Sequence, residues 1–370
     1  MNDYKGSNYS IWQTKPYTKE EFIKISPKDK LNYLCLAAHL APSTHNTQPW
    51  RFEIHPETME VTFLIDGQFI LPASDVNGRQ TTISCGCAIK NMEIAANYFG
   101  YKINEEILIL SKEELKPEQA NKKLIRLCKI NFIFTPDITG DEKLYKSLFK
   151  RQVTRAEYDE QKEIPEETLN KISNIKTENI KIHLVSDRWR RLSISEFQGQ
   201  ADNFVINSKK FSRELGDWLL PNDTENFVGM PGVGFGLSDD ETQRLHLGLQ
   251  GKIPLKPEDG LKFSLGGKIG IEKSPIVCFL TAAEDSVKNW LEAGKIMENI
   301  FLELAAEEIS FTVHAGIAEV SLINKLFSMS ILGTTRKIMT LFRIGYTKRD
   351  EDARRPHSPR LPLEKIITNY

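Results

Sequence analysis

The sequence predicts an α+β protein made of two related halves. Stretches with the helical spacing of apolar residues alternate with short apolar runs along the chain, which is typical of helices packed on sheets. Two long, small-residue-rich stretches also share a spacing, because Gly86 precedes Asn91 by five residues and Gly294 precedes Asn299 by five. Since small residues let helices approach closely, we expect the halves to pack helix against helix. Each half should hold a mixed or antiparallel sheet flanked by helices.

Composition is that of a soluble globular protein. Of the 370 residues, 40% are hydrophobic and 27% are charged, which leaves ample apolar material for a core. The formal net charge of -1 predicts no nucleic-acid or membrane partner, and no apolar run approaches the length of a membrane span. The polar first fifteen residues lack a secretory signal, and the five cysteines lie mostly in apolar runs typical of reduced thiols. We therefore expect a cytoplasmic location.

The first half, 1–140, shows helical and strand periodicities in turn after a polar lead. The expected elements are a helix over 27–40, strands near 50–55 and 59–65, a long helix within 75–101, and strands near 107–110 and 129–135.

The second half, 141–370, restarts with a charged stretch. The expected elements are two helices within 141–172, a strand at 181–185, helices up to 218, loops at 228–240 and 263–274, a strand at 276–281, a long helix within 286–308, a further helix, and a strand at 338–346. The sequence GGKIG at 266–270 lacks the spacing of a phosphate-binding loop, so we expect a turn there.

A dense polar turn follows the first helix. Six consecutive hydrogen-bonding residues, Ser43 to Gln48, lie between that helix and the strand that begins at Trp50. Ser43 and Thr44 offer short hydroxyls, and the amide of Asn46 can both donate and accept. The turn could line a cofactor, although a solvated surface loop would explain the same residues.

Arginines form the second feature. Arg151 and Arg155 lie four residues apart in RQVTR, which places them on one face if the segment is helical. Guanidinium groups bind phosphate oxygens bidentately, and Arg360 near the C-terminus could close such a cradle. A solvated helix face or an ion pair would also account for the first two arginines.

These motifs together resemble those of the flavin-dependent nitroreductase family. APSTHNTQPW resembles the family's P-S-[ST]-x-N-x-Q-P-W turn, and SPRLPLEKII resembles its C-terminal stretch. RQVTR resembles the Arg-rich turn that contacts the FMN phosphate and ribityl chain, with Val153 where the family has Ser or Thr. SDVNGRQTTISCGCAIKN and the chain length are similar to the Acg-like, double-length branch. The resemblance covers roughly residues 30 to 367.

The resemblance implies a fused pseudo-dimer with one complete flavin site. In the family's homodimers the polar turn and the Arg-rich turn at one flavin come from different subunits, whereas here the first half carries one and the second half carries the other. Two further residues, His314 and Gly316, lie where the family chain passes close to the isoalloxazine, although packing would explain them equally. The implied FMN-binding residues are Ser43, Thr44, Asn46, Gln48, Arg151, Gln152, Arg155, His314, Gly316 and Arg360.

Two functions follow from the resemblance. The first is an NAD(P)H-dependent oxidoreductase that reduces a nitroaromatic, a quinone or a similar small-molecule acceptor. The flavin would carry the chemistry, so no catalytic side chain is expected, and the seven histidines show no metal-binding spacing. The second is an FMN-binding or flavin-sequestering protein with little turnover, in which 228–240 forms a lid over the flavin. The choice between NADH and NADPH stays open. We expect a monomer, with room for further dimerisation.

Overall fold

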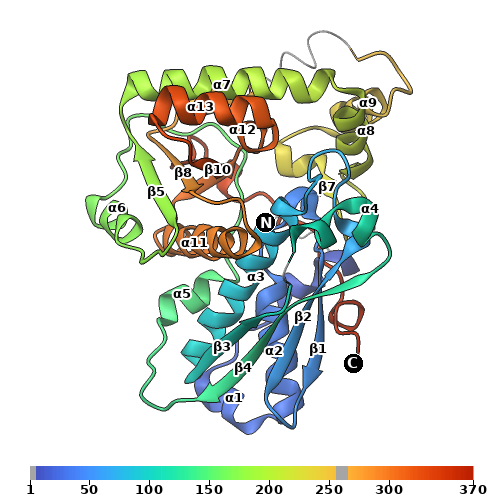
Figure 1. The fold of residues 1–370 in the computed structure, drawn as a ribbon, viewed down its shortest axis with the longest axis vertical. Helices are drawn as coiled ribbons and strands as arrows, with labels where there is room; N and C mark the ends of the chain where they lie inside the picture. The colour runs from blue at the N-terminus through green and yellow to red at the C-terminus, as the bar shows by residue number, and fades with distance from the viewer. Residues whose placement is uncertain (1–5, 110, 256–265, 370) are drawn as a thin grey trace.

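The computed structural model describes residues 6–109, 111–255 and 266–369, and it contains two four-stranded antiparallel sheets (Figure 1). In spatial order, the first contains β1 (Trp50–His55), β2 (Glu60–Asp66), β4 (Leu124–Phe134) and β3 (Tyr101–Ile107). The second contains β5 (Ile180–Val185), β8 (Ile276–Ala282), β10 (Lys337–Gly345) and β9 (Ser310–Val313). Both sheets place their four strands in the same order relative to the chain. The predicted α+β class with two antiparallel sheets flanked by helices is confirmed.

Two twenty-residue helices, α3 (Arg79–Tyr98) and α11 (Val287–Ala306), pack against each other between the sheets (Figure 1). A Cβ atom on Gly86 would collide with the carbonyl oxygen of Leu291, and one on Gly294 would collide with that of Ile83. The two helices therefore touch backbone to backbone at the glycines that shared a spacing in the sequence.

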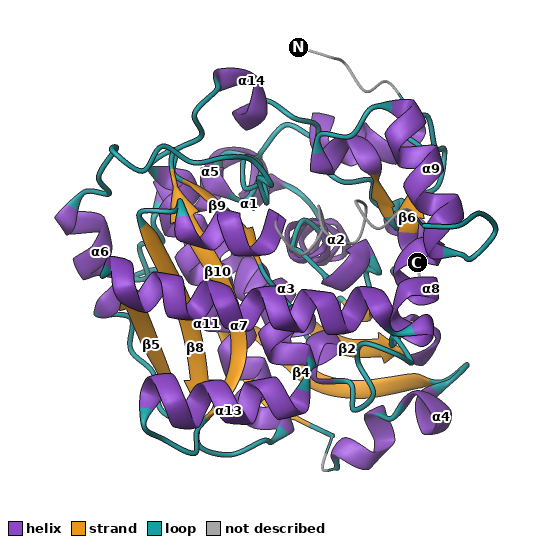
Figure 2. Ribbon diagram, turned by 90° about the horizontal axis from the view of Figure 1, so that it is seen from above, coloured by secondary structure: helices purple, strands orange, loops and turns teal. Residues whose placement is uncertain are grey.

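The remaining helices cover the outer faces. In Figure 2, α7 and α13 lie over the second sheet, on the side opposite α11 in Figure 1. The bounds are α1 Lys19–Lys24, α2 Pro27–His39, α4 Pro117–Ala120, α5 Glu142–Ser147, α6 Glu166–Ser173, α7 Arg188–Asn207, α8 Lys209–Trp218, α9 Asp239–Leu249, α12 Gly316–Glu319, α13 Ser321–Leu332 and α14 Asp350–Ala353. A parallel pair of short strands, β6 (Leu219–Leu220) and β7 (Met230–Pro231), brackets one loop. No helix of the described ranges is long and apolar enough to cross a membrane.

Helix α2 positions the candidate site. Ser26 accepts a hydrogen bond from the amide of Asp29, and Pro27 occupies the first turn, so the start of the helix is well defined. Leu31, Leu34 and Cys35 are fully buried, which fixes the rotation of the helix. The helix ends at His39, directly before the polar turn.

The C-terminal tail crosses from the second half to the first. The amide of Phe52 donates to the carbonyl of Ile366 at 2.8 Å, and the amide of Thr368 donates to the carbonyl of Phe52 at 2.9 Å. At the other sheet, the amide of Thr154 donates to the carbonyl of Phe311 at 2.9 Å. These edge contacts hold the Arg-rich segment and the tail against their sheets.

Two sequence-based expectations on local structure were wrong. Residues 266–272 are helical, although a turn was expected at 266–270 and a loop over 263–274, of which 263–265 lie outside the described residues. Gly267 lies in this helix at a close contact with α7. A Cβ at this position would collide with the carboxylate of Asp202, so the contact requires glycine. Strand β3 ends at Ile107, where a strand near 107–110 was expected to begin, and residue 110 is not described. One of its inward positions is Glu105, paired with Lys295, which interrupts the apolar alternation.

Candidate cofactor site

The polar turn has a left-handed backbone at three non-glycine residues. The φ angles are 49° at His45, 56° at Asn46 and 51° at Gln48. Such conformations persist only where the surroundings hold them, and strain of this kind clusters at functional sites. Here the hydroxyl oxygen of Ser43 accepts from the amide of Gln48 at 3.0 Å and fixes the turn from within.

The side chains of Asn46 and Gln48 clamp two distant segments onto the turn. Asn46 donates to the carbonyls of Gly229 and Pro359, at 3.0 and 2.9 Å. Gln48 donates to the carbonyl of Phe227 at 2.7 Å and accepts from the amide of Leu361 at 2.8 Å. Because these bonds use the amide groups, the structure gives them a clamping role where the sequence indicated cofactor contacts.

A pocket of about 90 Å³ lies where the turn, the Arg-rich segment, the C-terminal tail and the Gly/Pro-rich segment (residues 228–240) meet. None of the described residues that line it is Asp or Glu. The lining residues are Tyr9, Trp12, Pro42, Ser43, His45, Asn46, Arg151, Gln152, Val153, Arg155, Met230, Pro231, Val233, Gly234, Phe235, Pro356, His357, Ser358 and Arg360.

Among the arginines that line the pocket, Arg155 makes the fewest polar contacts with the described residues. Its guanidinium lies 4.3 Å from the centre of the Phe235 ring and makes no hydrogen bond to the described residues. Burial, together with the cations Arg355 and Arg343, lowers the pKa of Arg155 to about 10. An anion in the pocket would relieve that excess of positive charge.

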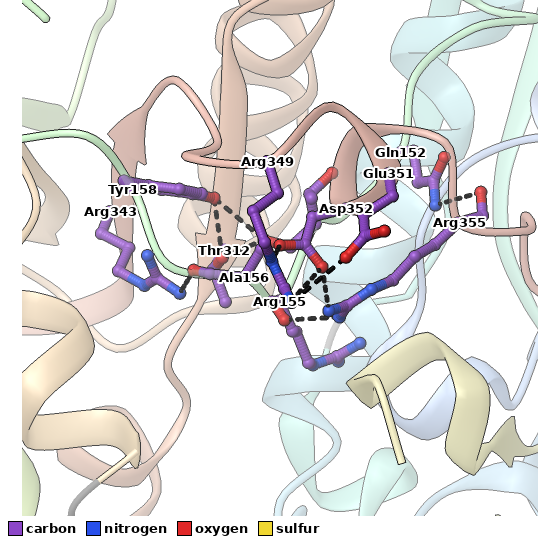
Figure 3. A network of polar contacts seen from close by, with 11 residues as sticks. Gln152, Arg155, Ala156, Tyr158, Thr312, Arg343, Arg349, Glu351, Asp352 and Arg355 are labelled. Carbon is purple, nitrogen blue, oxygen red and sulfur yellow. Dashed lines mark hydrogen bonds and ion pairs between the residues drawn. The ribbon is translucent and has the colours of Figure 1, made fainter. Parts of the chain in front are cut away.

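Arg355 links Arg155 to an acidic residue of the tail. Arg355 donates to the backbone carbonyl of Arg155 at 2.7 Å and pairs with the carboxylate of Asp352 (Figure 3). Gln152 donates to the carbonyl of Arg355 at 2.8 Å, so the tail is held to the Arg-rich segment at both residues. The tail sequence predicted none of these contacts.

Arg360 is buried, and the chain accepts hydrogen bonds from all five of its N–H groups. Its Nε donates to the carbonyl of His39 at 3.1 Å, its Nη1 to Asn46 and Pro359, and its Nη2 to Leu40 and Ala41. Burial and nearby Arg151 lower its pKa to about 9. As arranged, Arg360 contributes positive charge to the pocket, and all of its donors are bonded to the chain.

Arg151 is held on two sides. Its Nε pairs with Glu298 at 3.0 Å, and its Nη2 donates to the carbonyl of Leu40. Its Nη1 bonds to no described residue, and Arg151 is one of the residues that line the pocket.

Two histidines add neutral polar groups. The Nδ1 atom of His45 is buried and has no hydrogen-bond partner among the described residues. Burial lowers the pKa of His45 to about 4, with a further contribution from Arg155. His357 stacks on Trp12 at 4.0 Å, and burial lowers its pKa to about 3. The sequence did not single out His357, because its only signal was a basic tail.

Four predicted residues, Thr44, Gln48, His314 and Gly316, do not line the pocket. The hydroxyl of Thr44 donates to Gln80 at 3.0 Å, and its backbone amide donates to the hydroxyl of Ser84. Both groups are therefore bonded to α3. His314 accepts from Arg343 at 3.2 Å. A Cβ on Gly316 would press on Gln198 and Asp202 of α7, so this glycine faces that helix. Of the predicted set, the structure brings together Ser43, Asn46, Arg151, Gln152, Arg155 and Arg360, with Gln48 directly behind them.

The donor set fits a phosphate ester that carries a polyol chain, as FMN does. Two arginines with available donors, a third buried cation, a serine hydroxyl and an unpartnered imidazole nitrogen face a wall without carboxylates. Pockets that bury organic ligands measure roughly 300–1,000 Å³. A flavin ring would therefore require the wall formed by residues 230–235 to shift. No group of three or more His, Cys, Asp or Glu side chains within the described residues could hold a metal ion.

The chain is similar over most of its length to proteins of Mycobacterium tuberculosis, some of which are named as proposed NAD(P)H nitroreductases. One such relative is the Mycobacterium tuberculosis protein acg, a proposed NAD(P)H nitroreductase, which is 20% identical over 330 residues covering 88% of this chain and 92% of that protein. An uncharacterized M. tuberculosis protein is 24% identical over 344 residues, or 90% of this chain and 91% of its own length. The resemblance inferred from the motifs is thus confirmed. No family model matches the chain.

Two solved structures that match part of this chain are described as nitroreductases. NfnB of Mycobacterium smegmatis in complex with NADPH has a TM-score of 0.38 and 17% identity, covering 60% of this chain and 96% of that chain. A nitroreductase with bound FMN from Bacteroides fragilis has a TM-score of 0.32 and 14% identity, covering 56% and 89%.

Proposed function

We propose that this chain is an FMN-binding, NAD(P)H-dependent oxidoreductase that reduces a nitroaromatic, a quinone or a similar small acceptor. The observation that supports it best is the arginine-lined pocket without carboxylates, built from the two segments that resemble the flavin-binding turns of nitroreductases. The proposed NAD(P)H nitroreductase activity of the relative acg supports the same reading.

The chain's residues bind and orient the cofactor in this proposal. Arg155 and Arg151 would hold the phosphate, and Ser43 and Gln152 would contact the ribityl chain. Arg360 would add positive charge, while Asn46 holds Gly229 and Pro359 at the pocket through hydrogen bonds to their carbonyls. When bound, FMN supplies hydride transfer from NAD(P)H to the acceptor, so no side chain needs to act as acid or base.

A second candidate is a flavin-sequestering protein. It is favoured by the Gly/Pro-rich segment, because Phe235 contacts Arg155 and the amide of Gly229 donates to the carbonyl of Asn46 at 3.3 Å. A segment bonded across the pocket in this way would shield a flavin from nicotinamide.

One purification and one assay test both candidates. The protein is purified, its flavin is quantified by absorbance, and NADH or NADPH oxidation is followed with menadione or a nitrofuran as acceptor. Bound FMN with turnover supports the oxidoreductase, and bound FMN without turnover supports sequestration. Protein that binds no FMN would overturn both.

A further inference from the structure

Two buried arginines share the C-terminal end of α2. Both Arg151 and Arg360 donate to the carbonyl of Leu40, and Arg360 also donates to the carbonyls on either side of it. Helix C-termini carry partial negative charge, which suits cations. Partial charges do not neutralise two whole ones, however, so the pair needs an anion.

The anion supplied by the chain is Glu298. This residue comes from α11 of the second half, does not line the pocket, and has a side-chain exposure of 0%, against 3% for Arg151. Its Oε1 forms an ion pair with Arg151 at 3.0 Å. The same oxygen accepts a hydrogen bond from the side-chain amide of Asn91 at 2.9 Å when that amide is oriented with its nitrogen toward Glu298. Its Oε2 is buried without a hydrogen-bond partner among the described residues.

The cluster is therefore two cations around one carboxylate. Burial raises the pKa of Glu298 to about 7, although the charges of Arg151 and Arg360 lower it. Removal of the carboxylate from water therefore makes its negative charge unfavourable despite the nearby arginines. A carboxylate is kept in such a place when the alternative is an uncompensated buried cation. Because Arg151 also reaches the pocket wall, a phosphate there and Glu298 would neutralise the same guanidinium from two sides.

We infer that Glu298 is a built-in counter-ion that stands in for part of the charge of the cofactor phosphate and keeps the two arginines buried before FMN binds. The inference rests on the proposed function. Its consequence is that Glu298 stabilises the FMN-free protein while it weakens FMN binding, since the two anions act on the same cation.

Glu298→Gln tests this consequence. Glutamine keeps the shape and the acceptor oxygen for Arg151 and Asn91 but removes the charge. We expect the FMN-free variant to melt at a lower temperature than the wild type, and to bind FMN about tenfold more tightly. Riboflavin, which lacks the phosphate, should bind both proteins equally. Glu303→Gln on the same helix is the matched control, because Glu303 is partly buried but its charge partners are lysines and acids rather than arginines.

The outcomes are distinct. Wild-type protein that does not bind FMN would refute the proposed function. Wild type that binds FMN together with a variant that binds it no more tightly would refute the counter-ion role, and weaker binding would mean that Glu298 only positions Arg151. Should the variant not fold alone, FMN present during refolding should rescue it and riboflavin should not. Equal rescue by both, or by neither, would overturn the inference.

Discussion

At the scale of single residues, the arginines that line the pocket differ in how many hydrogen bonds they make to the rest of the chain. Arg360 donates all five N–H groups to the chain, and Arg151 makes one hydrogen bond and one ion pair, whereas Arg155 makes no hydrogen bond to the described residues. Removing Arg151 would also leave Glu298 buried without its ion-pair partner, so its loss mixes stability with binding. Arg155 therefore gives the cleaner test of phosphate binding.

Arg155→Ala should weaken FMN binding by about 2 kcal/mol, or about thirtyfold, through lost charge-assisted bonds to the phosphate. Riboflavin affinity should hardly change. Titration of the flavin-free protein with each ligand, followed by fluorescence quenching, measures both. The exposed Arg354 of the C-terminal tail provides the control as Arg354→Ala. Equal losses for FMN and riboflavin would show that Arg155 does not bind the phosphate.

A buried carboxylate on α7 predicts the pH dependence of stability. Burial raises the pKa of Asp202 to about 8, with nearby Glu319 adding to the rise, while its bond from Gln198 at 2.6 Å opposes it. The folded protein thus holds a proton that the unfolded chain releases near pH 4. Stability from this group is full below that pH and is lost as the pH rises through 8.

Asp202→Asn should therefore reduce the fall in unfolding free energy between pH 6 and pH 9 by about 2.7 kcal/mol, the value of the two pKa units from pH 6 to the folded pKa of about 8. Urea denaturation at the two pH values measures it, and Asp217→Asn at an exposed site serves as the control. A variant with the same alkaline loss as the wild type would contradict the assignment.

Residue identities located the site better than they located the bonds within it. The turn, the Arg-rich segment and the tail do meet at one pocket. The partners of the Asn46 amide, however, lie 183 and 313 residues further along the chain. Local chemistry shows that an amide can bond to a cofactor, but it cannot show that distant carbonyls have already taken its donors.

At the scale of elements, apolar spacing found the long helices and the central strands because these bury whole faces. It failed where a buried polar partner replaced an apolar residue, as at Glu105 in β3, and where glycines in a helix face a bulky neighbour, as at Gly267. Both errors come from tertiary contacts that a window of sequence does not contain.

The Gly/Pro-rich segment is the element whose role is most open to test. Its start is fixed by Asn46 and its end by Arg355, against which Gly236 lies so closely that a Cβ would collide with the guanidinium. Deletion of Gly232–Phe235 should leave FMN bound and raise the rate of flavin reduction by NAD(P)H in stopped flow.

Phe235→Ala is the companion variant, since it removes the ring over Arg155 without shortening the segment. We expect it to have a smaller effect than the deletion. Fully loaded FMN with an unchanged reduction rate in the deletion variant would show that the segment does not gate the flavin.

At the scale of the whole molecule, the two halves are alike in topology but not in site chemistry. In the first half the amide of Thr44 donates to Ser84, two residues before Gly86. At the matching place in the second half the amide of Glu178 donates to Glu292, two residues before Gly294. The halves therefore differ at this matched position, and the polar turn and the Arg-rich segment each occur once in the chain. We therefore expect about one FMN per chain, and a measured ratio near two would contradict this asymmetry.

The last prediction concerns the division of the chain near residue 140. The proposed site takes its turn from the first half and its arginines from the second, and α3 and α11 bury their glycine contact only when both halves are present. The second half alone would also expose its tail, whose residues 366–368 pair with β1. Fragments 1–140 and 141–370 should each be insoluble or flavin-free when expressed alone. The intact chain should have the mass of a folded monomer by light scattering, because the fusion buries the interface that a homodimer would need. Co-expression of the two fragments should restore FMN binding in a one-to-one complex. A soluble, flavin-loaded 141–370 fragment would show that the site does not depend on the first half.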